Sequence, residues 1–360
     1  MSKRKRVARR AVILSLFASA AGAEPLPAEE DSHGWHYDFY GSLRMQAETV
    51  RPGNRDALSA YSGIRDAYSR LGVNAHYEWA GGTRLFGQIE LPFDSANMRM
   101  HDPYDQGGVG RTDRDGRKDP ARTRIARAGL EGALGTLSVG QQWMPYYNAI
   151  SAPLDWFSTY YSGFATYTSF RVENTIAYYS PDLNGFGLAF SYSNDRGNRR
   201  SPARIDDRRI QGTVSYALDD FTVAAGVDDR GNADGYRDRI YGLSGTYTRG
   251  SWYFAAKYEV TDNNVPDSFY GDGSRAVNLL ASYTAGRNTY KAMVARVKNY
   301  GDNIIHLGVD HQYNEALTLF AEYYREQETA AITSERGGLA EFDAAARGGQ
   351  VLAVGLRYNF

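Results

Sequence analysis

Apolar and polar residues alternate along most of this chain, in runs separated by residues typical of turns. In the first run, one face consists of Tyr37, Phe39, Gly41, Leu43, Met45 and Ala47. The intervening positions carry polar side chains, including Asp38, Arg44 and Glu48. A period of two predicts a β-strand with one apolar face and one polar face.

The same pattern recurs and divides the chain into sixteen predicted strands. Each is close to the ~9–11 residues of a tilted strand that crosses a bilayer, and an even number suits a closed bacterial barrel. The predicted spans are 35–48, 68–80, 82–93, 121–132, 135–143, 171–180, 185–194, 208–218, 221–229, 237–248, 251–261, 274–284, 287–297, 303–313, 316–326 and 348–360.

The connections between these strands alternate in length. Tight turns are predicted at 80–82, 132–135, 218–221, 249–250 and 285–286. Long connections are predicted at 49–67, 94–120, 144–170 and 327–347. Short turns at one end and long loops at the other are typical of outer-membrane barrels.

Aromatic residues recur at the ends of the predicted strands. They are Trp79, Trp143, Tyr178, Trp252, Tyr313, Tyr323 and Tyr358. A soluble β-sandwich also has many short strands, but it does not need aromatic residues at these places, whereas a barrel uses them at the membrane interfaces. We therefore predict an all-β fold, a transmembrane antiparallel β-barrel of sixteen strands.

The composition excludes several other classes. With 42% hydrophobic and 13% aromatic residues the chain is unlike a disordered protein. It has no cysteine, which rules out disulfides, thiolate zinc sites and a cysteine nucleophile. Beyond the N-terminus no apolar run approaches the ~18 residues of a transmembrane helix.

The N-terminal segment is predicted to be a cleaved signal peptide, residues 1–23. Six Lys and Arg residues precede the apolar stretch 11–20, and Ala21-Gly22-Ala23 is a small-residue cleavage site. Residues 24–360 then form the barrel. Removal of the six positive charges leaves 35 basic and 42 acidic residues, a net charge of −7, so we expect no nucleic-acid partner.

A series of motifs, spread in order over the mature chain, resembles the trimeric general porins of Gram-negative outer membranes. The motifs are Phe39-Tyr40-Gly41, Tyr68-Ser69-Arg70-Leu71-Gly72, Thr123-Arg124-Ile125, Ala128-Gly129-Leu130, Phe170-Arg171-Val172-Glu173-Asn174-Thr175, Tyr179-Ser180-Pro181, Gly185-Phe186-Gly187 and Val354-Gly355-Leu356-Arg357-Tyr358-Asn359-Phe360.

The resemblance implies an outer-membrane homotrimer in contact with lipid and lipopolysaccharide. Phe360 and Tyr358 resemble the terminal signal that the barrel-assembly machinery reads. A barrel of sixteen strands is too wide for side chains to fill, so we expect a water-filled channel for passive diffusion of ions and small hydrophilic solutes.

The resemblance also implies that the third external loop, residues 144–170, folds inward as a constriction. Asp155 is its only charged residue, and the acidic, glycine-rich motif usual in the family is missing. Aromatic residues such as Trp156 and Tyr160 stand in its place. A substrate-selective porin with an aromatic-lined constriction is therefore an alternative to a general one.

Basic residues on the barrel wall are expected to face this loop. Arg70, Arg124 and Arg171 occupy the places of the basic ladder in similar porins, and Arg44 is a fourth candidate. Alternation alone places Arg70 inside, and it places Arg171 inside if Val172 and Ile176 face lipid. Three arginines opposite one aspartate predict a local charge of +2 and a weak anion preference or near neutrality.

Two alternative interpretations of the basic residues remain. The arginines of the ladder could instead pair with inward carboxylates such as Glu48, Glu78, Glu90 or Glu173. Arg127 is predicted to face lipid if Ile125 does, which suggests either a shift in register or, preferably, a subunit interface with the small residues Ala126 and Ala128.

No catalytic, cofactor or metal site is predicted. Asp113-Arg114-Asp115-Gly116 has only a fragment of calcium-loop spacing. His33 and His36 lie near the mature start, and His306 and His311 are predicted on opposite faces of one strand. An outer-membrane lipase or protease is the weaker alternative, because we find no convincing pair of a serine or aspartate with a histidine.

Overall fold

The computed structural model describes residues 34–56, 58–100, 123–161, 165–194, 208–230, 237–264, 272–297, 303–327 and 348–360. The predicted signal peptide, the segment Asp113–Gly116 and the predicted loop 327–347 beyond residue 327 lie outside these residues. No helix in the described part of the chain is long and apolar enough to cross a membrane.

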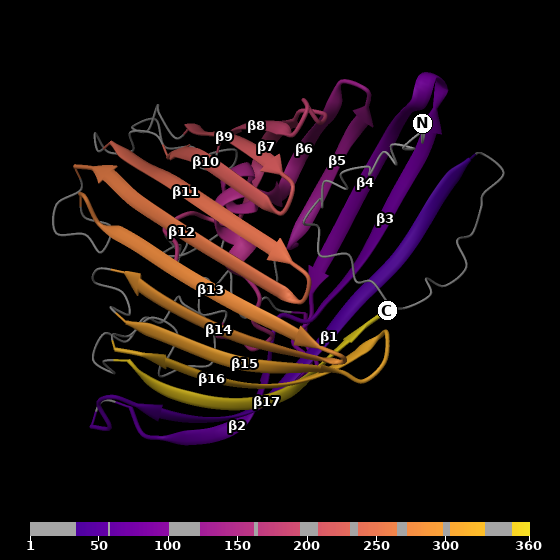
Figure 1. Cartoon of the computed structure of the whole chain (residues 1–360). Helices are drawn as coiled ribbons and strands as arrows, with labels where there is room; N and C mark the ends of the chain where they lie inside the picture. Colours follow the sequence, from indigo (N-terminus) through magenta and orange to yellow (C-terminus); the bar gives the residue numbers. More distant parts are fainter. Residues whose placement is uncertain are drawn as a thin grey trace, which may run out of the picture.

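The described residues form one antiparallel sheet that closes on itself (Figure 1). β1 pairs with β17 along one edge and with β2 and β3 along the other, and each later strand pairs with its neighbours in the sequence. The strands are β1 (Trp35–Pro52), β2 (Tyr61–Asp66), β3 (Arg70–Trp79), β4 (Thr83–Pro92), β5 (Ile125–Gly132), β6 (Gly135–Trp143), β7 (Arg171–Tyr179), β8 (Phe186–Asn194), β9 (Arg208–Leu218), β10 (Phe221–Asp229), β11 (Asp238–Arg249), β12 (Trp252–Asn263), β13 (Arg275–Ala285), β14 (Asn288–Val297), β15 (Ile304–Gln312), β16 (Leu317–Glu326) and β17 (Gly349–Asn359).

β2 and β3 are two parts of one barrel strand, so the seventeen strands make the sixteen-stranded barrel that the sequence predicts. Each predicted span overlaps one observed strand. The prediction of a loop over 49–67 is wrong, because β1 continues to Pro52 and residues 61–66 form β2. Alternation does not continue smoothly from β2 to β3, which is why the sequence pattern missed β2.

A one-residue bulge separates β2 from β3. Met45 pairs with Asp66 and Ser42 pairs with Arg70, so three residues of the second strand face two of the first. Tyr68 lies in this bulge with a φ of 71°. The extra residue reverses which positions face the lumen, so that Arg65 and Arg70 both point inward.

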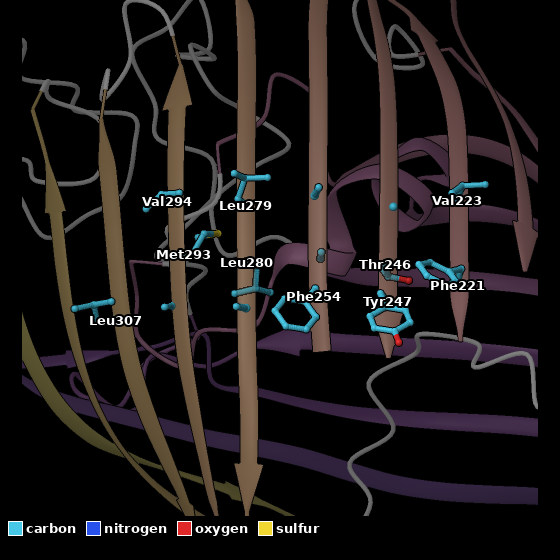
Figure 2. Close-up of a pocket in the computed structure, with 15 residues that line it drawn as sticks. Phe221, Val223, Thr246, Tyr247, Phe254, Leu279, Leu280, Met293, Val294 and Leu307 are labelled. Atoms are coloured by element: carbon cyan, nitrogen blue, oxygen red, sulfur yellow. The ribbon is translucent and has the colours of Figure 1, made fainter. Parts of the chain in front are cut away.

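The outward face of the strands is apolar and solvent-accessible, as expected for a surface covered by lipid. Leu243 is 57% exposed and Val354 is 52% exposed. Small outward residues of β11–β14 leave an apolar depression of about 610 Å³ between larger side chains such as Leu279 (Figure 2). The polar faces of the same strands turn toward the lumen, where Glu48, Lys257 and many others are buried; the core is therefore inside the barrel.

The barrel closes at the C-terminus. The Gly41 N–H donates to the Phe360 carbonyl at 2.8 Å, and the Phe360 N–H donates to the Gly41 carbonyl at 3.1 Å. A Cβ on Gly41 would lie 2.2 Å from the Phe360 ring, so only glycine allows the ring to pack here. Tyr358 stacks next to Phe360, with ring centroids 5.9 Å apart.

Candidate functional site: a constriction inside the barrel

The connection between β6 and β7 consists of residues 144–170, and its described residues, 144–161 and 165–170, lie inside the barrel. We refer to this connection as the inner loop. Its described part contains two short helical turns, η2 (Tyr147–Ser151) and η3 (Ala152–Leu154). Its described residues contact the inward faces of β9–β16 and β1. Figure 1 shows its helical turns inside the ring of strands. Four groups of contacts attach it to the wall.

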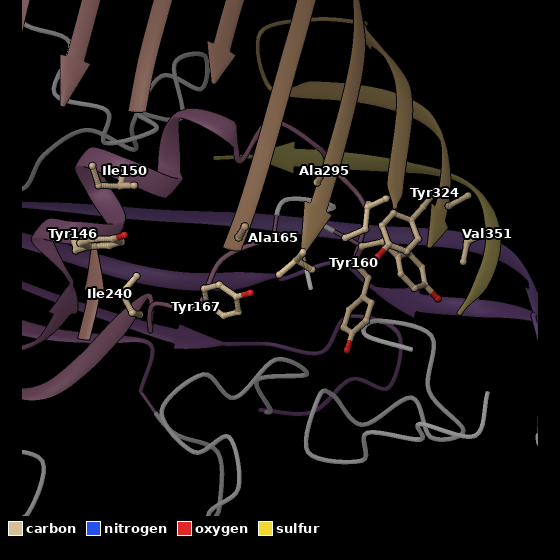
Figure 3. Close-up of a cluster of buried hydrophobic side chains, with 14 of the residues drawn as sticks. Tyr146, Ile150, Tyr160, Ala165, Tyr167, Ile240, Ala295, Tyr324 and Val351 are labelled. Carbon is tan, nitrogen blue, oxygen red and sulfur yellow. The ribbon is translucent and has the colours of Figure 1, made fainter. Parts of the chain in front are cut away.

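The first attachment fits apolar side chains against glycines of the wall. Tyr146 and Ile150 pack on Gly226 of β10 and Gly242 of β11. Figure 3 shows these two side chains of the loop near Ile240 of β11. A Cβ on Gly242 would lie 2.1 Å from the Tyr146 hydroxyl, so the close approach requires glycine. The Tyr146 N–H also donates to the Gln211 side chain of β9 at 3.0 Å.

The second attachment uses a buried cluster of charges on β14–β16. The backbone N–H groups of Ser158 and Thr159 donate to the Glu322 carboxylate at 2.7 and 3.1 Å. The Lys291 ammonium bonds to Glu322 at 2.9 Å and to the Trp156 carbonyl at 3.0 Å. Because Lys291 and Glu322 are each only 3% exposed, each depends on the other and on the loop to offset its desolvation.

An imidazole adds to this second attachment. His306 of β15 is fully buried and lies 3.1 Å from the Glu322 carboxylate. The ring of Phe157, from the inner loop, stacks on the His306 ring with centroids 3.5 Å apart. The loop therefore contributes an apolar side chain and backbone donors to one charge cluster.

The third attachment lies on β12 and β13 and holds the inner loop at Ala165 and Thr166. The Lys257 ammonium donates to the Ala165 carbonyl and, at 2.8 Å, to Glu259. Glu259 accepts from the Thr166 hydroxyl at 2.7 Å, and Asn278 accepts from the Ala165 N–H at 2.8 Å. Here too, a buried pair of opposite charges holds the loop backbone.

The fourth attachment joins the loop to β1, β2 and the bulge. The Tyr68 hydroxyl donates to the Tyr160 carbonyl at 2.6 Å, and the two rings stack at 5.6 Å. The Arg65 guanidinium lies 4.1 Å from the centre of the Tyr160 ring on the other side. Gln46 accepts the Tyr160 N–H at 2.8 Å.

These contacts alter the role expected for the aromatic residues of the loop. Tyr160 is 2% exposed and Tyr161 is 1% exposed, because both pack against the wall and not toward the lumen. Trp156 is half-buried and stacks on Tyr253 at 4.3 Å. The expectation of a constriction lined by aromatic side chains is therefore wrong for Tyr160, which anchors the loop.

Asp155 is the charged residue that the loop exposes to the lumen. Its carboxylate accepts a hydrogen bond from the Tyr147 hydroxyl at 2.8 Å. Displacement of water by the surrounding barrel raises the pKa of this carboxyl, while the Tyr147 hydrogen bond and the charges of Arg44 and Arg70 oppose the rise. The net effect is a raised pKa.

Several arginines lie close together on the barrel wall and interact electrostatically with Asp155. Glu90 of β4 lies among them: its carboxylate is 2.8 Å from Arg124 and 3.5 Å from Arg70, and it also interacts with Arg171. The expected carboxylate pairing thus occurs, through one shared glutamate. Arg124 and Arg171 are each 5% exposed, whereas Arg70 is partly open to the lumen.

Arg44 extends this cluster to the closing seam of the barrel. It interacts with Arg70 and Arg124 and with Asp155. Its direct partner on β17 is Arg357, which the sequence analysis did not single out as a site residue. Five arginines and two carboxylates, Glu90 and Asp155, leave this cluster with a net charge of +3.

The comparisons with known proteins agree with this architecture. Residues 11–331 match the family described as Gram-negative porin. The chain belongs to the Gram-negative porin family. No curated protein matches its sequence.

Several solved structures share the fold of this porin at low sequence identity. An anion-selective porin from Comamonas acidovorans aligns with a TM-score of 0.68 and 17% identity, over 91% of this chain and 100% of that chain. OmpF of Salmonella typhi, in a complex with daunomycin, gives 0.66 and 17%, over 92% and 99%. OmpT of Vibrio cholerae gives 0.63 and 18%, over 94% and 100%.

Two orientations expected from the sequence of this porin are wrong. Ile125 is 3% exposed and does not face lipid, and Arg127 points inward, where it donates to Gln88 at 2.9 Å and lies over Phe86. Arg127 therefore does not carry the energetic cost of an arginine that faces lipid. Val172 is 8% exposed and packs with the inner loop, not with lipid.

Arg171 nevertheless reaches the arginine cluster. A second bulge shifts the register between β6 and β7, where Asn174 has a φ of 51°. Simple alternation does not continue through such a bulge, and Val172 does not face lipid, so alternation does not explain the position of Arg171. Arg171 nevertheless interacts with Glu90.

The signal that could have found Arg357 was present in the sequence of the porin. It alternates with Leu356 and Tyr358, which are exposed on the outer face, so its side chain must point inward. No group of three metal-ligating side chains occurs among the residues that the structure describes.

Proposed function

We propose that this porin is an outer-membrane channel for passive diffusion of ions and small hydrophilic solutes, with an eyelet that favours anions weakly. The eyelet is the opening between Asp155 on the inner loop and the wall arginines Arg44, Arg70, Arg124 and Arg171, with Arg357 as a further member. The observation that carries the proposal is the excess of arginine over carboxylate in this cluster.

A charge excess at a narrow point has more effect than one in the vestibules. Ions near the wall of a constriction are poorly shielded by water, whereas exposed charges elsewhere are screened beyond ~8–10 Å at physiological salt. The anchored aromatic residues favour a general channel over an aromatic-lined selective one, because Tyr160 and Tyr161 do not face the solutes.

The proposed assembly is a homotrimer. The outer face of β4 and β5 carries the small residues Gly87, Ala126 and Ala128, where another barrel could approach closely. Export through cleavage after Ala23 and insertion by the barrel-assembly machinery belong to the same proposal.

Recordings in planar bilayers test the channel and its assembly together. Purified protein should insert with ohmic current steps that close in threes, and a salt gradient should give a reversal potential on the anion side of zero or close to zero. A strong cation preference would contradict the proposed eyelet. Conductance in single steps only would contradict the proposed trimer.

A further inference from the structure

Two histidines that lie far apart in the sequence meet on the lumen wall, away from the eyelet. His36 of β1 and His76 of β3 are direct cross-strand partners. Their rings stack with centroids 4.9 Å apart and planes 18° apart. Both side chains are half-buried. The spacing of the two histidines in the sequence does not reveal this contact, because the pairing of β1 with β3 brings His76 beside His36.

The pair lies near the short-turn end of the barrel, which is the periplasmic end in such proteins. It is three residues from Trp79, the last residue of β3, and η1 (Ala80–Gly82) makes the tight turn that follows. On the outer face the neighbouring pair, Trp35 and Tyr77, packs with ring centroids 5.4 Å apart, and this contact fixes the register of the two strands.

The charged groups around the pair favour a cation. Asp38 on β1 and Glu78 on β3 lie two residues from the histidines on the same face, about 6.6 Å along the strand. On β4, Arg84 is paired with Glu131 at 2.6 Å. Arg127 of β5 lies beyond Phe86, the β4 partner of His76. Along β1 and β3 the charged residues nearest to the two histidines are therefore negative, and Arg84, which is the cross-strand partner of Glu78, is also bonded to Glu131.

We propose that His36 and His76 form a binding site for a divalent transition-metal ion such as Zn²⁺ or Cu²⁺. A neutral imidazole offers one ring nitrogen as a ligand, and two nitrogens about 3.4 Å apart suit a tetrahedral ion with Zn–N distances of about 2.0–2.1 Å. The two imidazole rings already stack on each other, and rotation about their Cβ–Cγ bonds brings one nitrogen of each ring to this N–N separation.

The protein supplies two nitrogen ligands, and water completes the coordination. Such a site binds reversibly and prefers zinc, copper or nickel over calcium or magnesium, which require oxygen ligands. Binding adds two positive charges to the lumen wall at the periplasmic mouth, separate from the arginines of the eyelet.

Titration calorimetry of the folded, detergent-solubilised protein with Zn²⁺ tests the site without reference to channel activity. The wild type should bind one ion per chain, and His36→Asn and His76→Asn should each weaken binding about tenfold or more. Cu²⁺ electron paramagnetic resonance should show two imidazole nitrogens in the wild type and fewer in either variant. Mg²⁺ at the same concentration should not compete.

Two matched variants separate this site from other histidines. His311→Asn removes a histidine that contacts Asn288 at 2.8 Å, and it should leave Zn²⁺ binding unchanged. His33→Asn removes a histidine three positions before His36, outside the described residues, and should also leave binding unchanged. Loss of binding in either control, or equal binding by wild type and the His36→Asn/His76→Asn double variant, would overturn the proposal. Heat-modifiable gel mobility verifies that each variant has folded.

Discussion

The position of Glu90 among the arginines of the eyelet determines how much positive charge a permeating ion meets. Glu90 bonds to Arg124 and lies near Arg70, so it neutralises part of the cluster and holds two guanidinium groups in place. Asp155 offsets further charge from the opposite side of the opening. The remaining excess is small, which is why we expect a weak preference and not a strict anion filter.

Replacement of a wall arginine should shift selectivity toward cations. In Arg70→Ala or Arg171→Ala the net charge of the cluster falls from +3 to +2, so the reversal potential in a KCl gradient should move in the cation direction. Arg249→Ala, at the exposed end of β11, is the control and should leave the potential unchanged. An unchanged potential in both eyelet variants would show that these arginines do not set selectivity.

The pH dependence of selectivity should depend on Asp155. Protonation of this carboxyl removes a negative charge from the eyelet, so anion preference should increase as the pH falls. The surrounding barrel displaces water and raises this pKa, so the step should begin at a higher pH than for a free aspartate. Reversal potentials measured at a series of pH values should show this step in the wild type. Asp155→Asn should show anion preference already at neutral pH and lack most of the step.

Single residues also show where sequence reasoning worked and where it stopped. Arg70 was placed correctly because its neighbour Leu71 marks the lipid face by simple alternation. Arg127 was misplaced because Ile125 is apolar yet faces inward, which hydrophobicity alone does not reveal. Pairing across strands, as between Arg44 and Arg357, depends on a barrel closure that no local pattern contains.

The inner loop packs inside the barrel, and in our proposal it is the element that narrows the channel. The sequence predicted a long connection here, and the resemblance to porins implied that it folds inward. Its attachments come from lysines and glutamates on distant strands, such as Lys257 and Glu322. These residues look like ordinary lumen charges in the sequence. Only the fold shows that they bond to the backbone of the loop.

Two aromatic residues of the loop should behave differently when truncated. Tyr160→Ala removes a side chain packed between Tyr68 and Arg65, at a cost of about 3–5 kcal/mol, so the loop should loosen and the open-channel current should become noisier. Trp156→Ala, at a half-buried position, should raise conductance modestly with little noise. Single-channel noise spectra of the two variants provide the comparison. Equal, quiet increases in conductance would contradict an anchoring role for Tyr160.

The buried charge cluster of the second attachment should be as important as the aromatic contacts. Glu322→Gln leaves Lys291 with Asp310 as its remaining carboxylate partner at 2.8 Å, and breaking a buried pair typically costs about 3–5 kcal/mol. The variant should show current fluctuations and a lower thermal unfolding temperature. Glu315→Gln, in the exposed turn before β16, is the matched control and should match the wild type in both measurements.

For the whole molecule, the closing seam joins the two ends of the chain. β1 pairs with β17 over eleven residue pairs, and the two hydrogen bonds between Gly41 and Phe360 follow them. The sequence predicted a closed barrel because its strands number sixteen and its turns alternate in length. It did not predict the bulges, since one added residue leaves almost no trace in a pattern of period two.

Deletion of Phe360 should reduce the yield of folded barrel in the outer membrane sharply, while export continues. The deletion removes both seam hydrogen bonds to Gly41, the ring that covers this glycine and the proposed assembly signal. Fractionation and heat-modifiable mobility on gels measure the yield. As a control, Phe221→Ala removes another outward aromatic residue near a turn and should have a much smaller effect. A wild-type yield of the protein that lacks Phe360 would contradict the proposed assembly signal.

The bulge at Tyr68 limits how the length of the chain can change during evolution. In β2, before the bulge, the odd-numbered residues face the water-filled lumen. In β3, after the bulge, the even-numbered residues face the lumen, so the two halves of the strand differ by one residue in their alternation. Loss of one residue here would bring both halves into one phase and force Arg65 or Arg70 into hydrocarbon, at about 2–4 kcal/mol near the bilayer centre. Substitutions in this segment should therefore be tolerated more readily than single insertions or deletions, and compensating length changes should occur in pairs.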